Sequence, residues 1–288
     1  MRAVFKHELS SYFTGLIGYI FGAFLLLACG YSVMVWNLQG LNSTFEVVAG
    51  DMSIIFIVVV PILTMRVLAE ERRQRTDQLL YALPLTMTQV VLGKYFAMLV
   101  VLLIPTVIIC LYPVLLGAYG TVYLLSAFTS ILGFVLLGGA LLAMGMYISS
   151  ITENVIVSAI LCLAVMAANF FIAYASLYLP ATAYASFVTL MVVGVVIGLI
   201  AYFMTKNYYA AIAVAGTLDL GIFLTYKINA GLFENLVPKV VVELSLYERF
   251  YSLLNGLFDL TGVVYLLSVA GLFLFMSVQS MEKRRWSE

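Results

Sequence analysis

The sequence predicts an all-α membrane protein that crosses the bilayer about eight times. Hydrophobic residues make up 64% of the 288 residues and charged residues 10%, and the mean hydropathy is +1.12. Soluble proteins average about 25% charged residues. The charges lie in short segments between apolar stretches that are long enough to cross a hydrocarbon core of about 30 Å. We therefore expect a single multi-pass transmembrane domain over residues 1–288.

Residues 1–13 are expected to form a helix in the membrane interface. Phe5, Leu9 and Tyr12 form an apolar stripe at helical spacing among charged residues. A cleaved lipoprotein signal ending at Cys29 is an alternative, but the apolar run continues through Cys29 to Trp36 without a break. This continuity favours a retained first helix.

The distribution of charges defines the other spans and their direction. With both termini inside, eleven Lys or Arg residues face the cytoplasm and three face outward, which follows the positive-inside rule. The second span carries Pro61, which is expected to kink it, and residues 228–258 form an amphipathic extracytoplasmic segment. The expected spans are 15–36, 47–66, 95–116, 122–150, two spans within 154–205 that turn at Leu179-Pro180-Ala181, 210–226 and 260–281.

Residues 66–94 form the one long polar segment on the cytoplasmic side. They hold eight of the 28 formal charges. Leu79, Leu80 and Leu83 lie in this polar segment, where exposed apolar side chains indicate a surface that meets a partner protein. Pro84 disfavours helix at the preceding residue and divides the segment into two short elements. A solvated loop that only fixes the topology is the simpler alternative.

The motifs of this segment resemble the permease subunit of type-2 ATP-binding-cassette (ABC) transporters. The resemblance rests on Glu70-Glu71-Arg72-Arg73, Thr76, Leu79-Leu80 and Pro84, followed by Gly93-Lys94 at the start of the next span. Near the C-terminus, residues 248–260, 264–268 and 282–286 are similar to the branch that includes gliding-motility permeases. Together these regions cover about 1–160 and 230–288. Since members of this family commonly have six spans, 180–227 is interpreted as an inserted helical hairpin.

The resemblance implies a role in ATP-driven export across the bacterial cytoplasmic membrane. It implies a partner ATP-binding subunit that holds ATP and Mg²⁺, a second permease subunit that is identical or related, and an auxiliary membrane protein of the gliding-motility type. The chain itself is expected to hold no cofactor, since Gly93-Lys94 lacks the spacing of a phosphate-binding G-x-x-x-x-G-K-[ST] loop. The residues expected to couple to the ATPase are Glu70, Glu71, Arg72, Arg73, Thr76, Leu79, Leu80, Pro84 and Lys94.

Other functions are either excluded or kept as alternatives. The formal net charge of zero argues against nucleic acid as a partner, and the spacing of the cysteines indicates packing residues rather than a metal site. Asp219 lies about 10 Å inside the outer end of its helix, so a proton-coupled secondary transporter that uses Asp219 with Glu153 or Lys206 is the main alternative. An accessory or sensor protein is a third class. Asn169 is expected to bond a neighbouring helix or to face the pathway.

Overall fold

The predicted all-α membrane fold is confirmed at the level of its class. The computed structural model describes residues 1–74, 86–175, 178–254 and 259–287, and these ranges contain helices and no strand. Seven helices in the described residues are long and apolar enough to cross a membrane. The predicted span 210–226 corresponds to a further helix, α12 (Tyr208–Ile228), of 21 residues.

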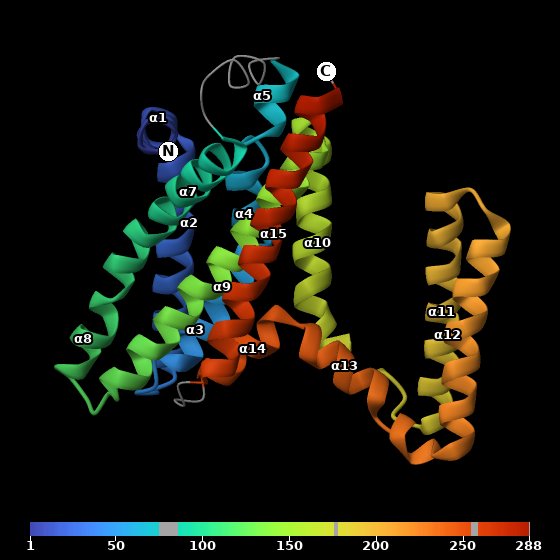
Figure 1. The fold of residues 1–288 in the computed structure, drawn as a ribbon. Coiled ribbons are helices and arrows are strands. Elements are labelled where there is room, and N and C mark those ends of the chain that lie inside the picture. Colours follow the sequence, from blue (N-terminus) through green and yellow to red (C-terminus); the bar gives the residue numbers. More distant parts are fainter. Residues whose placement is uncertain (75–85, 176–177, 255–258, 288) are drawn as a thin grey trace. The chain divides into compact units, whose positions relative to one another are not determined.

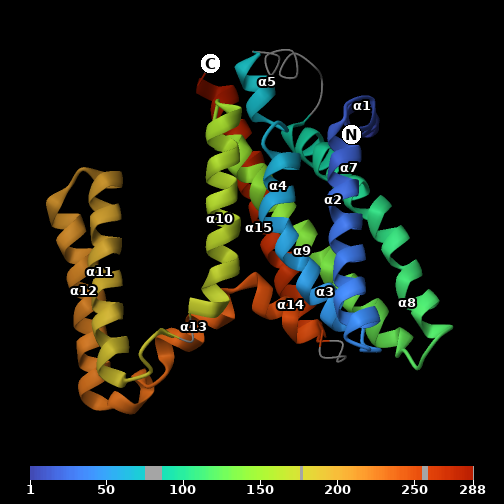
Figure 2. The same ribbon diagram turned by 180° about the vertical axis from the view of Figure 1, so that it is seen from behind.

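The chain divides into two compact units, which are described separately. The large unit comprises Met1–Phe170 and Leu246–Glu288, and the hairpin unit comprises Phe171–Ser245. Figures 1 and 2 show the helices of both units. The large unit is built from α1 (Arg2–Thr14), α2 (Ile17–Ser32) with a π-helical end η1 (Val33–Gln39), α3 (Glu46–Met52), the 3-10 turn η2 (Ser53–Ile55), α4 (Phe56–Thr64), α5 (Ala69–Arg73), α7 (Met87–Ile109), α8 (Leu111–Gly117), α9 (Leu124–Ile151), most of α10 (Val155–Ala175), α14 (Leu246–Leu254) and α15 (Leu260–Ser287).

Helix α9 forms the centre of the large unit. It packs against α4, α7, α14 and α15, and 78% of its most apolar part is buried. Small residues allow this close packing, because a Cβ atom at Gly138 would lie 2.8 Å from both Phe56 and Leu102. The rings of Phe56 and Phe134 stack with their centroids 4.4 Å apart. The helices around α9 are therefore fixed by steric fit rather than by charge.

The second predicted span is broken into short helices. α3 and α4 are joined through η2, and α4 continues through Pro61 to Thr64 before a turn over residues 65–68 leads into α5. The turn and α5 begin the polar segment at one end of the large unit. At the same end, Arg284 Nη1 of α15 lies 2.9 Å from Glu153 Oε1, and Ser280 Oγ donates to the Ser150 carbonyl at 3.1 Å. We call this region the polar end (Figures 1 and 2, at the top).

The hairpin unit consists of two long helices and a short connecting region. α11 (Ala183–Thr205) packs along α12, and the turn between them uses Lys206 with a left-handed φ of 53°. At the opposite end the rings of Phe187 and Tyr226 stack at 4.5 Å. The unit is completed by η4 (Ala230–Phe233) and α13 (Leu236–Leu244).

Two buried tyrosines allow a matched test of the packing. Tyr247 is 0% exposed, and its hydroxyl has no hydrogen-bond partner among the described residues. Tyr95 donates from its hydroxyl to the Gly139 carbonyl at 3.1 Å. We expect Tyr247→Phe to leave the free energy of unfolding unchanged or raise it by about 1 kcal/mol, and Tyr95→Phe to lower it by about 1 kcal/mol. Thermal unfolding of the purified protein in detergent measures both, and equal losses would contradict this assignment.

Candidate functional site

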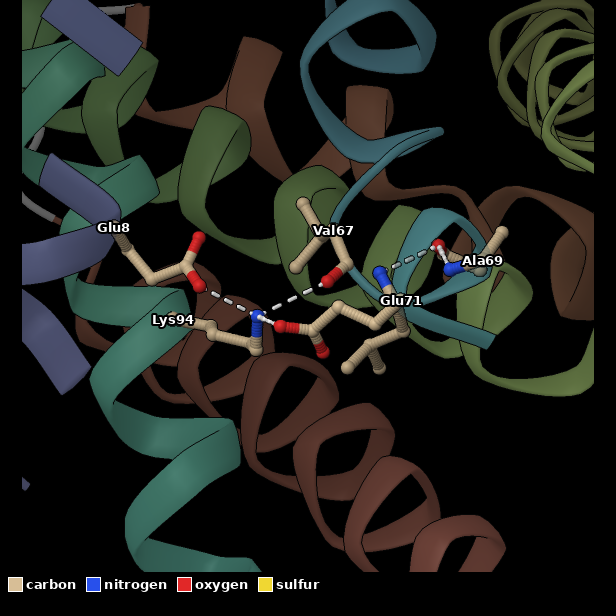
Figure 3. Close-up of polar contacts among 7 residues, drawn as sticks. Glu8, Val67, Ala69, Glu71 and Lys94 are labelled. Atoms are coloured by element: carbon tan, nitrogen blue, oxygen red, sulfur yellow. Dashed lines mark hydrogen bonds and ion pairs between the residues drawn. The ribbon is translucent and has the colours of Figure 1, made fainter. Parts of the chain in front are cut away.

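Lys94, at the start of the third turn of α7, is the centre of a buried ionic cluster at the polar end. Its side chain is 2% exposed, and its ammonium lies 2.6 Å from Glu8 Oε1 and 2.7 Å from Glu71 Oε1. It also donates to the Val67 carbonyl at 3.2 Å. Figure 3 shows that Glu8 and Glu71 approach the ammonium from different helices. We call Lys94, Glu8 and Glu71 the ionic lock.

The lock joins three elements that are distant in sequence. Glu8 comes from α1, Glu71 from α5 and Lys94 from α7, and Glu8 and Lys94 are 86 residues apart. The ammonium has three N–H donors, and its three acceptors use all of them. Each N–H proton of the buried ammonium therefore has a hydrogen-bond acceptor, as a buried charge requires.

Gly93 allows α1 to lie close enough for Glu8 to reach Lys94. A Cβ atom at position 93 would lie 3.2 Å from the Val4 side chain and 3.4 Å from the Met1 carbonyl oxygen. The apolar stripe of α1 faces inward, because Tyr12 is buried and both Phe5 and Leu9 pack against the core. The opposite face of α1 exposes Arg2 and Lys6.

Side chains from α7 and α9 satisfy the backbone at the break between α4 and α5. Val67, Leu68 and Ala69 are all buried, and a buried helix break has free carbonyl and N–H groups that need partners. Lys94 takes the Val67 carbonyl, while Ser149 Oγ accepts from the N–H groups of Leu68 and Ala69 at 3.2 and 3.1 Å. The start of the polar segment is thus held by two other helices.

Two carboxyl groups and one ammonium make up the lock. Tyr12 lies beside it, and burial, together with the charges of Glu8 and Glu71, raises the pKa of Tyr12 above its ordinary value. The phenol is therefore neutral at pH 7 and adds no further negative charge. Glu8 and Glu71 are 16% and 25% exposed, so both keep contact with the surroundings.

The predicted coupling residues fall into two groups. Glu70, Glu71, Arg72 and Arg73 lie on α5, with Glu71 in the lock, Arg72 buried and Glu70 paired with Arg66 at 3.6 Å. Together with Lys94 they gather at the polar end. The other predicted residues, Thr76, Leu79, Leu80 and Pro84, lie outside the described residues.

The predicted intramembrane residues are not members of the lock. Asp219 Oδ1 and Asn169 Oδ1 are buried and accept no hydrogen bond from the described residues, and the roles expected of these two residues stay predictions. Glu153, one of the two residues that the carrier hypothesis combines with Asp219, forms an ion pair with Arg284 in the large unit. Asp219 belongs to the hairpin unit and faces Gly194 of α11.

Glu8 and Ser149 are functional candidates that the sequence analysis missed. Glu8 lies among the charged residues of the N-terminal helix with no sign of a distant partner, and Ser149 lies at the end of the predicted span 122–150. The spacing of Glu8 and Tyr12, one helical turn apart, places a carboxylate beside the buried face of α1. That pattern is the one signal in the sequence that could have indicated an inward-facing Glu8.

Comparison with known proteins does not extend the motif resemblance. No protein-family model matches the chain, and a search of curated proteins finds no relative. The function is therefore argued from the geometry of the polar end and from the motifs of residues 66–94.

Removing the cation of the lock is expected to destabilise the protein strongly. Lys94→Ala removes the ammonium that Glu8 and Glu71 share, which should lower the free energy of unfolding by about 3–5 kcal/mol. Arg66→Ala is the matched control, because Arg66 is 53% exposed and exposed ion pairs contribute about 1 kcal/mol or less. Chemical denaturation of the reconstituted protein measures both variants. A loss for Lys94→Ala no larger than that for Arg66→Ala would contradict the lock.

Filling the contact at Gly93 tests how α1 is held. Gly93→Leu should push α1 away from α7, because its side chain would meet Val4 and the Met1 carbonyl. In that background Glu8→Gln should have little further effect on stability, whereas in the wild-type background it weakens the lock. Comparing the two unfolding free energies gives a double-mutant cycle. Equal effects of Glu8→Gln in both backgrounds would show that the lock does not depend on the packing of α1 against Gly93.

Proposed function

We propose that this chain is the membrane permease subunit of an ATP-driven ABC transporter, and that it works as an exporter. The observation that carries the proposal is the ionic lock, which ties the start of segment 66–94 to α1 and α7. A segment that receives a movement from a partner can move the membrane helices only if it is firmly joined to them. The motifs of the same segment resemble the coupling element of type-2 ABC permeases.

The surface of the polar end supports a protein partner on this side. Arg66 and Arg73 are exposed beside the lock, whereas Arg72 is buried. The buried side of the segment thus anchors it, and among the described residues Arg66 and Arg73 present their side chains at the surface. Exposed arginines are typical of contact surfaces between proteins.

In this proposal each component has a defined role. A separate subunit binds ATP and Mg²⁺ and hydrolyses the nucleotide, while this chain carries the substrate path through the bacterial cytoplasmic membrane. A second permease subunit, identical or related, completes the path, and an auxiliary membrane protein of the gliding-motility type is a further candidate partner. Membrane lipid surrounds the apolar faces of the spans.

Purification from the native cells in mild detergent tests the proposal directly. We expect a nucleotide-binding subunit to remain bound, as identified by mass spectrometry, and the eluate to hydrolyse ATP. The double variant Leu79→Asp with Leu80→Asp should release that subunit and reduce the ATPase activity of the eluate by about tenfold or more, equivalent to about 1.4 kcal/mol of binding free energy.

A matched variant controls for the introduction of two carboxylates. Leu41 and Tyr119 are 89% and 93% exposed and lie in turns predicted on the opposite side of the membrane. Leu41→Asp with Tyr119→Asp should keep the ATPase bound. A chain that purifies alone without hydrolysis, or equal loss in both double variants, would contradict the permease assignment. The first of these outcomes would favour a proton-coupled carrier, for which the unpartnered Asp219 is the residue to replace.

A further inference from the structure

Asp219 is a carboxylate near the middle of a long apolar helix. It lies eleven residues after Tyr208 and nine before Ile228, the bounds of α12. At about 1.5 Å per residue the 21 residues of α12 extend about 30 Å, the thickness of the hydrocarbon core. A charged side chain at that depth costs on the order of 3 kcal/mol unless a partner compensates it.

The hairpin unit supplies no such partner among its described residues. Asp219 has no hydrogen bond or ion pair there, and its Oδ1 atom is buried. Its neighbour is Gly194 on α11, where a Cβ atom would overlap Oδ1. α11 carries no charged residue between Ala183 and Thr205, and on α12 the ammonium of Lys227 lies over the Phe223 ring at 5.8 Å.

The same position is open to another helix. Asp219 is half-buried at the seam between α11 and α12, and a Cβ atom at the nearby Gly216 or Gly221 would have nothing within 4 Å. Only 17% of the most apolar part of α11 is buried. Taken by itself, the hairpin unit therefore has an apolar surface around one carboxylate that its described residues do not compensate.

The described spans of the large unit offer no free cation at mid-membrane depth. In the described candidate spans, Lys and Arg residues lie toward the ends, and Lys94, the most buried of them, is already bound by Glu8 and Glu71. A second copy of this chain would carry its Lys and Arg residues at the same positions, toward the ends of the spans. The cation must then come from a different protein.

We propose that the seam at Asp219 and Gly194 is a docking site for a transmembrane helix of another membrane protein that carries a basic side chain at mid-membrane depth. The ammonium or guanidinium of that helix pairs with Asp219, and its apolar residues cover the exposed faces of α11 and α12. Because Gly194 has no side chain, the Asp219 carboxylate can lie close to the backbone of α11, and another helix can then approach closely. This proposal does not depend on the ATP-driven function.

Designed transmembrane peptides test the charge requirement with the full-length chain. The chain is reconstituted in phosphatidylcholine vesicles with a polyleucine peptide that has one central Lys and an adjacent photoactivatable leucine. The matched peptide has Leu in place of Lys. We expect about three- to tenfold more crosslinking with the Lys peptide, at positions that mass spectrometry maps to α11 and α12.

Replacement of the carboxylate provides the second arm. Asp219→Asn should reduce crosslinking of the Lys peptide to the level of the Leu peptide, because the amide keeps the shape and removes the charge. Asp51→Asn is the matched control; Asp51 accepts a hydrogen bond from Ser32 at 2.6 Å in the large unit, and its replacement should have no effect on crosslinking.

Three results would overturn the proposal. The first is equal crosslinking of the Lys and Leu peptides to the wild-type chain. The second is Lys-peptide crosslinking that Asp219→Asn leaves unchanged or that maps outside the hairpin unit. The third is a loss of self-association of the chain in the Asp219→Asn variant without a change in peptide binding, which would assign the seam to a second copy. None of these measurements involves ATP, so they are independent of the test of the permease assignment.

Discussion

The buried ammonium of Lys94 is the constraint on which the arrangement of the polar end depends. A charge that is 2% exposed is stable only if each of its protons meets an acceptor, and here the acceptors come from α1, α5 and the backbone of the turn before α5. The three segments cannot separate without leaving a charge in an apolar surrounding. An interaction that stabilises the protein thereby also fixes the geometry of the polar segment relative to α7.

The break in the helix between α4 and α5 connects α5 mechanically to other helices of the large unit. A continuous helix would carry residues 66–73 straight out of the membrane region, but the turn at residues 65–68 redirects the chain, and Lys94 and Ser149 hold the redirected backbone. Force applied to α5 is then resisted by α7 through Lys94 and by α9 through Ser149. Because α9 packs against most helices of the large unit, a displacement of α5 would reach its core.

Composition and charge pattern were sufficient to predict the all-α membrane class, since the cost of burying charges in lipid restricts where they lie. The ionic lock could not be predicted, because Glu8 and Lys94 are 86 residues apart and their pairing follows from tertiary packing at Gly93. The break before α5 was also missed; Met65-Arg66-Val67-Leu68 contains neither Gly nor Pro, and the turn depends on partners from other helices. The role of Asn169 stays a prediction, and Thr76, Leu79, Leu80 and Pro84 remain predictions outside the described residues.

The most direct test of the account is the free energy of unfolding across all combinations of Glu8→Gln, Glu71→Gln and Lys94→Met. If one ammonium is shared by both carboxylates, the double Gln variant leaves it unpaired and should lose more stability than the sum of the single variants, by about 1 kcal/mol or more. Adding Lys94→Met to that variant should restore much of the loss, because an apolar side chain replaces an unpaired charge. Additive losses, with no recovery on adding Lys94→Met, would show that the three residues do not act as one lock and would contradict the account.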